Sequence, residues 1–159
     1  MAIEDVFNGA KKALTLFDAY TNTVAQEIGM ERAVSLMTKM CENMGAIQGK
    51  MMKEQAGIKE FDAKAAWSLL RTTPEGLGLS IEVLEESPER VVVKVGKCSV
   101  YEAAHMLGMD AKTIETMCRA SSEKFMDTVA KQLNPNLSSR ITKFRSAPDD
   151  FCEEEIVLG

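Results

Sequence analysis

The feature that most constrains this chain is a change in the spacing of its apolar residues near residue 76. Before that point, apolar side chains recur every three or four residues, which is the spacing of amphipathic helices. After it, several short segments alternate apolar and polar residues, which is the spacing of strands with one buried face. This change of period predicts an α+β domain, with helices packed on a sheet.

The first half of the sequence predicts three helices. One covers about residues 3–25 and is broken at Gly29, and a second covers about residues 30–57. A third, shorter helix lies in DAKAAWSLLRT, where Asp62 is placed as the N-cap and Pro74 follows the last turn. The N-terminal part, residues 1–75, is therefore expected to be mainly helical.

The second half predicts two hairpins separated by helices. LGLSIEVLEE and RVVVKV form the first hairpin, and LSSRITKFRS and FCEEEIVLG form the second. Between them lie a short helix that closes at Gly108 and a longer one over about residues 111–132. We therefore expect one domain over residues 1–159, in which residues 76–159 form an antiparallel sheet of about four strands with helices packed on it.

The second predicted helix is rich in methionine, a flexible side chain that suits irregular apolar surfaces. Its methionines are Met30, Met37, Met40, Met44, Met51 and Met52. Such a stripe predicts core packing first and a homodimer interface second. A malleable ligand groove is a third interpretation of the same stripe.

The composition excludes some classes of binding partner. The net charge of −5 argues against nucleic acid as the main partner. No segment has the run of about 18 apolar residues that membrane insertion requires, and the N-terminal segment does not resemble a secretory signal. We therefore expect a cytoplasmic protein with a small-molecule partner. Its four cysteines are expected to be reduced, and their spacing matches no CxxC-type zinc motif.

The segment KCSVYEAAHMLGM carries the chain's only histidine among other reactive side chains. On a helix, Cys98, Tyr101, Glu102 and His105 would share one side. Cys98 would lie at the first turn, where the helix dipole favours a thiolate. Glu102 would then orient His105, or His105 would support the thiolate. The simpler interpretation of the spacing is that Cys98 is a small buried residue and Glu102 faces solvent.

The other cysteines follow the apolar stripes. Cys118 lies on the inner stripe of its predicted helix, and Cys41 lies in the methionine stripe, so both are expected in the core. Cys152 has the strand parity of Ile156 and is expected to point inward, while Glu155 has the opposite parity and is expected in solvent.

The second half of the chain resembles the L-2-aminothiazoline-4-carboxylic acid hydrolase family. The resemblance lies in a valine-rich strand ending in Cys-x-x-Tyr, a helix with a cysteine, an Asn-Pro loop, an Arg/Thr strand and an acidic turn before a cysteine. The matching positions are Cys98, Tyr101, Cys118, Asn134, Pro135, Arg140, Thr142, Asp149, Asp150 and Cys152. Ser99 stands where the family pattern has proline. The cysteine layout is also similar to that of the 4-vinyl reductase domain, a ligand-binding α+β fold related to the Bet3 trafficking subunits.

The resemblance implies hydrolytic opening of a small cyclic amidine or thiazoline. In that hypothesis Cys98 acts as nucleophile, Tyr101 as proton donor, and Glu102 or His105 as base or acid. The expected substrate-binding residues are Cys118, Asn134, Arg140, Thr142 and Cys152. The alternative implied by the 4-vinyl reductase likeness is a domain that binds a small molecule, metal or tetrapyrrole, or senses redox state. A structural interaction domain is a third possibility, with the cysteines scattered in the core.

Overall fold

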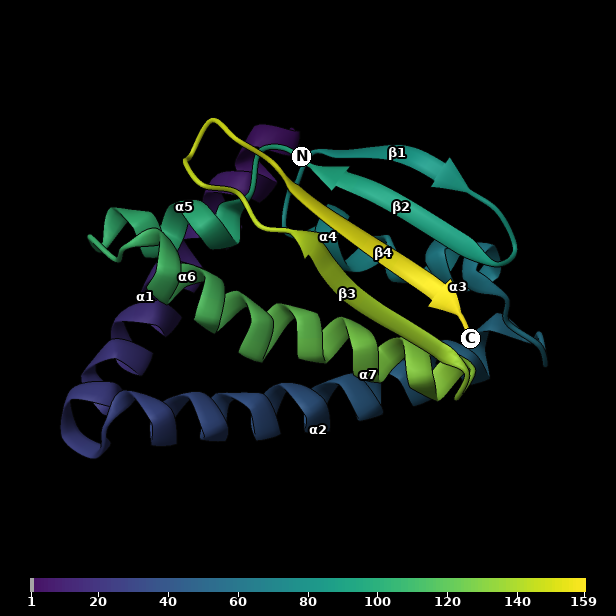
Figure 1. Ribbon diagram of the computed structural model, residues 1–159, viewed down its shortest axis with the longest axis horizontal. Helices are drawn as coiled ribbons and strands as arrows, with labels where there is room; N and C mark the ends of the chain where they lie inside the picture. The colour runs from purple at the N-terminus through teal and green to yellow at the C-terminus, as the bar shows by residue number, and fades with distance from the viewer. Residues whose placement is uncertain (1) are drawn as a thin grey trace.

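The computed structural model describes residues 2–159 and has the predicted α+β architecture (Figure 1). The helices of the first half are α1 (Ile3–Ile28), α2 (Met30–Ala56), α3 (Ala63–Leu70) and α4 (Thr72–Gly76). The second half contains β1 (Ile81–Glu86), β2 (Arg90–Val95), α5 (Ser99–Met106), α6 (Ala111–Cys118), the π-helical segment η1 (Arg119–Glu123), α7 (Lys124–Leu133), β3 (Leu137–Lys143) and β4 (Cys152–Leu158). The fold class predicted from the spacing is confirmed.

The long helices α1 and α2 form a hairpin that turns at Gly29, whose φ of 87° suits glycine better than any other residue. In Figure 1, α2 runs alongside α7 below the sheet. The two helices approach closely because Gly45 and Gly49 of α2 face α7. A Cβ atom at Gly49 would lie 2.6 Å from the Cβ of Gln132. The missing side chains therefore set the distance between these helices.

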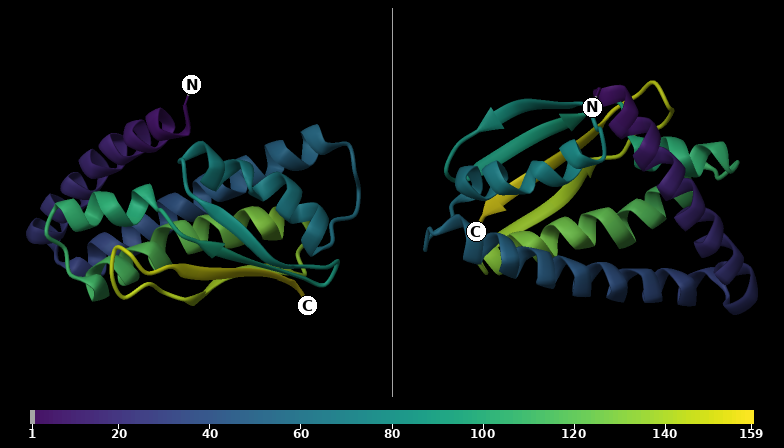
Figure 2. Two further views of the ribbon diagram at one scale, coloured as in Figure 1. Left: turned by 90° about the horizontal axis from the view of Figure 1, so that it is seen from above. Right: turned by 180° about the vertical axis from the view of Figure 1, so that it is seen from behind.

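The four strands form one antiparallel sheet in the order β1-β2-β4-β3. The last strand of the chain is thus central, with Val95 paired to Cys152 on one side and Ser139 paired to Ile156 on the other. The left view of Figure 2 shows the helices gathered on one side of the sheet. Alternation along β4 sends Cys152, Glu154 and Ile156 to this helical side.

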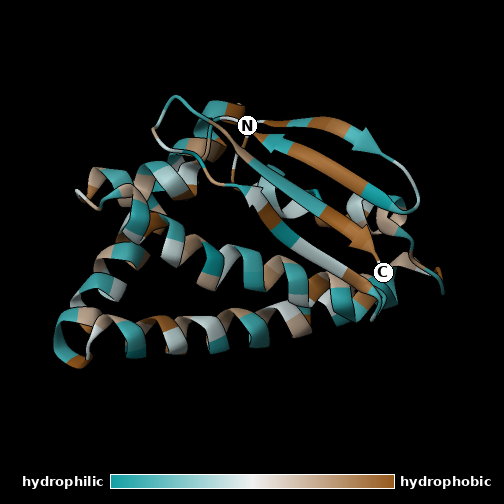
Figure 3. Cartoon of the chain, in the orientation of Figure 1, coloured by the Kyte–Doolittle hydropathy of each residue, from teal (hydrophilic) through white to brown (hydrophobic). Residues whose placement is uncertain are grey.

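The core fills the space between the sheet and the helices. Figure 3 shows apolar residues concentrated along β2, whose Val91, Val93 and Val95 pack against α3 and α7. Trp67 and Leu70 of α3 meet them from the helical side. Each of these five side chains is at least 95% buried, so the hydrophobic effect on this face holds the sheet and helices together.

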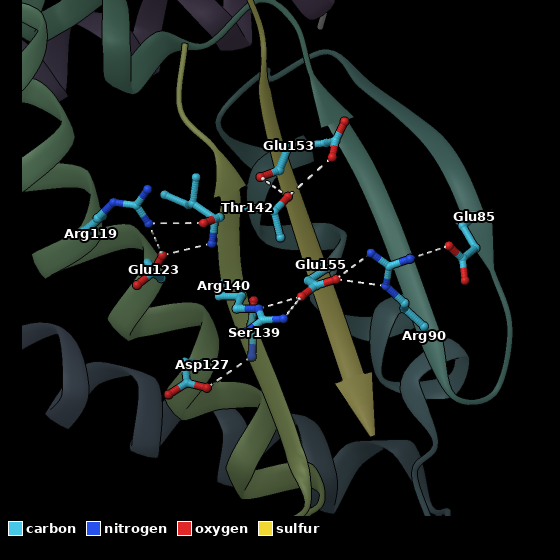
Figure 4. A network of polar contacts seen from close by, with 11 residues as sticks. Glu85, Arg90, Arg119, Glu123, Asp127, Ser139, Arg140, Thr142, Glu153 and Glu155 are labelled. Carbon is cyan, nitrogen blue, oxygen red and sulfur yellow. Dashed lines mark hydrogen bonds and ion pairs between the residues drawn. The ribbon is translucent and has the colours of Figure 1, made fainter. Parts of the chain in front are cut away.

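The outer face of the sheet carries a charged network (Figure 4). Glu155 was expected in solvent, but it is only 3% exposed because Arg90 and Arg140 reach over it from the neighbouring strands. Arg90 Nε donates to Glu155 Oε2 over 2.8 Å, and Arg140 forms an ion pair with the other carboxylate oxygen. The expectation for Glu155 was wrong because two arginines cover it, which strand parity alone does not reveal.

Candidate functional site

A cavity of about 380 Å³ lies between the α1–α2 hairpin and the α5–α6–η1 segment. Its wall is largely apolar and is made by Leu14, Phe17, Asp18, Met37, Met40, Cys41, Met44, Thr73, Pro74, Leu77, Leu79, Val100, Ala104, Ile114, Met117, Cys118, Ser121, Ser122, Phe125, Met126 and Glu154. A volume of this size and a wall with few polar groups are typical of small-molecule sites.

The methionine stripe of α2 is divided between core and cavity. Met37 is buried and packs with Cys41, Met117 and Ala120 in a small core cluster. Met40 and Met44 line the cavity beside Met37 and are also partly open to solvent. Flexible thioether side chains give this wall a shape that can adjust to a bound molecule.

Asp18 of α1 is the first polar group in the cavity wall. It lies one turn after Leu14 on the buried side of the helix and is 5% exposed. Its Oδ2 atom is buried and has no hydrogen-bond partner among residues 2–159. Burial raises the pKa of this carboxyl to about 6. Sequence reasoning missed Asp18, although its helical spacing from Phe7 and Leu14 places it on the apolar stripe.

Glu154 of β4 is the second polar group. It has the inward strand parity of Cys152 and Ile156 and reaches the cavity from the sheet. Burial raises its pKa to about 7, the nearby carboxylate of Glu123 adds to the rise, and the charge of Arg145 opposes it. The parity argument that was applied to Cys152 would also have identified this residue.

The three cysteines of the family pattern converge on the core beside this cavity. Cys98, Cys118 and Cys152 belong to one cluster of buried residues, and Cys118 also lines the cavity. None forms a disulfide. Burial raises the pKa of the Cys98 thiol to about 11, against the lowering effects of backbone hydrogen bonds and Arg145. The simpler interpretation, that Cys98 is a small buried residue, fits this burial. The alternative tendency towards thiolate does not fit, because desolvation outweighs the helix N-terminus.

The helix cap explains what the Cys98 side chain does instead. Cys98 is the N-cap residue of α5, and its Sγ accepts a hydrogen bond from the backbone N–H of Tyr101 over 3.5 Å. Burial likewise raises the pKa of the Cys118 thiol well above its ordinary value. Both thiols are thus held in the neutral form, which packs as a small apolar group.

Tyr101 lies behind the cavity wall in contact with a buried arginine. The guanidinium of Arg145 lies 5.1 Å from the centre of the Tyr101 ring, and Arg145 is 1% exposed. Its Nη2 donates to the carbonyl oxygens of Val95 and Gly96, and its Nε donates to Cys152 Sγ over 3.3 Å. Arg145 was missed, because a single arginine in the β3–β4 connection carries no sequence signal of burial.

The other two residues of the proposed catalytic group, Glu102 and His105, do not line the cavity. Glu102 pairs with Lys11 of α1 at 3.3 Å, and its side chain is about one-third exposed. His105 is exposed and stacks on Tyr101 with 5.9 Å between ring centres. The catalytic roles proposed for Glu102 and His105 stay predictions.

Four residues expected to bind substrate also lie outside the cavity wall: Asn134, Arg140, Thr142 and Cys152. Asn134 donates to the Phe61 carbonyl over 2.7 Å and caps the loop that follows α7. Arg140 and Thr142 lie on β3, where Arg140 pairs with Glu155 and Thr142 donates to the Glu153 carbonyl. Cys118 is the member of the predicted binding set that lines the cavity.

The helix between residues 111 and 133 is interrupted where it borders the cavity. A continuous helix was expected, but residues 119–123 form a π-helical segment between α6 and α7. This wider turn brings Ser121 and Ser122 to the cavity wall. Single π-helical turns inside α-helices occur often at functional sites.

Residues 2–159 contain neither a metal-binding cluster of histidine, cysteine or acidic side chains nor a membrane-spanning helix. No group of three or more histidine, cysteine, aspartate or glutamate side chains is arranged to hold a metal ion there. Within the same range, none of the helices combines the length and the apolar character needed to cross a bilayer.

The chain is similar to one protein family and to several solved structures. The sequence pattern described as L-2-amino-thiazoline-4-carboxylic acid hydrolase matches residues 10–153. No curated protein matches the chain. Similar solved structures include the phenol-responsive sensory domain of the transcription activator PoxR, crystallised with phenol (TM-score 0.63, 13% identity, 91% of this chain and 74% of that chain). They also include trafficking protein particle complex subunit 3 from Naegleria fowleri, covalently bound to palmitic acid (TM-score 0.57, 12% identity, 94% and 96%).

Proposed function

The chain belongs to the L-2-amino-thiazoline-4-carboxylic acid hydrolase family, and we propose that it binds a small, largely apolar molecule in the cavity beside α1 and α2. The observation that carries this proposal is the cavity of about 380 Å³, with its apolar wall and the carboxyl groups of Asp18 and Glu154. Apolar walls supply most of the binding free energy, and a few polar groups orient the ligand.

Two further observations support a binding role. Met37, Met40 and Met44 give the cavity an adaptable wall on one side, which favours molecules of varied shape. Two proteins of similar fold have been solved with organic molecules, one with phenol and the other covalently bound to palmitic acid. The likeness of fold does not transfer either ligand to this chain, but it supports the choice of a small apolar molecule.

A titration tests this proposal. Methyl resonances of labelled methionines are followed by NMR while propylbenzene is added to the purified chain, and we expect saturable shifts of Met37, Met40 and Met44. The variant Ser122→Phe fills the cavity and is expected to abolish these shifts. Thr116→Phe is the matched control, since Thr116 is exposed on α6 outside the cavity wall. Wild-type protein that binds no apolar probe would contradict the proposal.

Hydrolysis of a small heterocycle is the second candidate, favoured by the family and by the carboxyl pKa values. A carboxyl with a pKa of about 7, as in Glu154, is suited to accept a proton from water at neutral pH. Asp18, with a pKa of about 6, would hold the ring nitrogen. This version assigns the base to Glu154 instead of Glu102 or His105, with Cys98 and Tyr101 kept as the nucleophile and proton donor to be tested.

Ring opening of L-2-aminothiazoline-4-carboxylate by the purified chain tests the hydrolytic candidate, with Glu154→Gln, Cys98→Ala and His105→Ala compared side by side. Loss of turnover in Glu154→Gln alone would support the carboxyl as base. Loss in Cys98→Ala would support the thiol as nucleophile. If the wild type opens neither this ring nor one without the carboxylate, hydrolysis is not its function.

A further inference from the structure

We propose that Asp18 and Glu154 form a cation-binding pair, and that the ligand of this cavity is a small apolar molecule that carries one protonated amine. This inference rests on the proposed binding function and adds to it the charge of the ligand. It assigns a role to two residues that the family pattern does not include.

Asp18 provides the first reason. Its side chain is 5% exposed, lines the cavity, and has a carboxylate oxygen without a hydrogen-bond partner among residues 2–159. Buried polar atoms in folded proteins are nearly always hydrogen-bonded, and an isolated buried carboxylate is costly. A donor on the ligand would satisfy this oxygen, and an ammonium group would also neutralise its charge.

Glu154 provides the second reason. Although it lies in the middle of the central strand, its side chain faces the cavity and not the outer charged network. The basic group whose charge lowers its pKa is Arg145, which is committed to the Val95 and Gly96 carbonyls. Arg145 and Glu154 are not within ion-pair distance in the described chain, and Glu123 adds further negative charge. The wall near Glu154 is therefore short of positive charge.

The two carboxyl groups reach the same cavity from different walls. Asp18 comes from α1 and Glu154 from β4, and both line the cavity together with Cys118. A single ammonium group between them has three donors, which suits two carboxylates that approach from different walls.

The rest of the cavity wall indicates which sign of charge the ligand carries. Among residues 2–159, no lysine, arginine or histidine side chain lines the cavity. An anionic ligand would meet two carboxyls and no compensating cation. A neutral ligand would leave the Asp18 oxygen unpaired. An amine with an apolar body satisfies the carboxyls and fills the apolar volume, so we choose it over the other two classes.

Three probes of the same shape test the inference at pH 7.5: phenethylamine, propylbenzene and 3-phenylpropanoate. Affinities are measured from the methionine methyl shifts. We expect phenethylamine to bind at least about tenfold more tightly than propylbenzene, as a charge-assisted hydrogen bond in a buried site implies. We expect no saturable binding of 3-phenylpropanoate at millimolar concentration.

Amide variants test the contribution of each carboxyl group to amine binding. Asp18→Asn and Glu154→Gln keep the side-chain shape, and each is expected to weaken phenethylamine about tenfold while changing propylbenzene less than twofold. Glu153→Gln is the matched control, since Glu153 lies next to Glu154 on the outer face of the same strand. It is expected to leave all three affinities unchanged.

The possible failures are distinguishable. If propylbenzene binds as tightly as phenethylamine, or if neither carboxyl variant weakens the amine, the cation-binding pair is overturned and the apolar site stands. If phenylpropanoate binds best, the charge assignment is also overturned. If none of the three probes binds the wild type, the proposed function itself fails.

Discussion

The guanidinium of Arg145 lies over the ring of Tyr101, 5.1 Å from its centre, in a position where both side chains are at least 97% buried. Arg145 connects β2, β4 and α5 here. Its donors reach the carbonyls at the end of β2 and the thiol that begins β4, and its guanidinium covers the Tyr101 ring of α5. No carboxylate lies within ion-pair distance of it among residues 2–159. Backbone carbonyls, a thiol and an aromatic face hold the charge instead.

Replacing this arginine should therefore destabilise the fold. A lysine in Arg145→Lys keeps the charge but cannot make the forked contact to Val95 and Gly96, so the free energy of unfolding is expected to fall by about 2–4 kcal/mol. Urea denaturation measures the change. Arg71→Lys is the control, since Arg71 forms only an exposed pair with Glu75 and should change stability by less than about 0.5 kcal/mol. Equal stabilities of the two variants would contradict the structural role of Arg145.

The contact between α2 and α7 gives a second prediction. A Cβ at Gly49 would lie 3.0 Å from the Val129 carbonyl oxygen and 2.6 Å from the Gln132 side chain. Gly49→Ala should separate the helices and lower the unfolding free energy by about 1–3 kcal/mol. Gly9→Ala on α1 has no atom within 4 Å of the new Cβ and should raise it by about 0.5–1 kcal/mol, because alanine favours helix. Thermal unfolding of both variants checks that the signs are opposite.

Local spacing was sufficient to predict most of the fold. The break at Gly29, the cap at Asp62 and the two hairpins follow from period and turn chemistry, which act over a few residues. The order of the strands does not follow from them. Placing β4 between β2 and β3 depends on contacts between residues far apart in the chain, which a local pattern cannot report.

The candidate site was harder to predict for two physical reasons. Asp18 and Glu154 lie on apolar faces, and a charged residue on such a face is readily interpreted as solvent-exposed. The position of Cys98 at a helix start left both a thiolate and a buried neutral thiol open, because desolvation depends on the whole surrounding core. The resemblance to the family identified the cysteines that converge. Burial in the surrounding core raises the pKa of the Cys98 and Cys118 thiols, which the resemblance does not indicate.

The network on the outer sheet face predicts sensitivity to acid. Burial acts to raise the pKa of Glu155, but hydrogen bonds and charges from Arg90 and Arg140 outweigh it and hold the pKa below its ordinary value. Stability from this group is therefore present above the ordinary pKa and lost as the pH falls through the lowered one. Glu155→Gln should cost about 1–3 kcal/mol at pH 7 and much less at pH 2, measured by urea denaturation at both pH values. Glu153→Gln, next to it but only partly buried, should cost less than about 0.5 kcal/mol.

The buried thiols of Cys98 and Cys118 are expected to react slowly with alkylating reagents. With the pKa of Cys98 raised to about 11 and that of Cys118 raised well above its ordinary value, little thiolate exists at pH 8. Alkylation of these two cysteines by iodoacetamide in the native protein should be at least about 100-fold slower than in urea. Mass spectrometry after timed quenching identifies each modified residue. Rapid modification of Cys98 in the native state would instead support its role as a nucleophile.

The two cavity carboxyls predict a stability that falls as the pH rises. Burial raises the pKa of Glu154 from 4.5 to about 7 and that of Asp18 from 3.8 to about 6, so both hold protons in the folded state that the unfolded chain has released. Where the folded state binds more protons, the free energy of unfolding decreases with increasing pH. The free energy of unfolding contributed by these two carboxyls decreases between about pH 4 and pH 7, and the decrease is complete above pH 8.

Amide variants remove this dependence. Glu154→Gln should leave stability unchanged at pH 4 and raise it at pH 8 by up to about 3 kcal/mol, since one pKa unit corresponds to about 1.4 kcal/mol. Asp18→Asn should act in the same direction with its change complete by about pH 7. Glu153→Gln is expected to give the wild-type curve across this range. Urea denaturation from pH 4 to pH 8 measures the three curves. The contradicting result is a wild-type stability that rises over this window, with no gain in stability from either amide variant. Such a result would show that these carboxyls are solvated or paired instead of desolvated in the cavity wall.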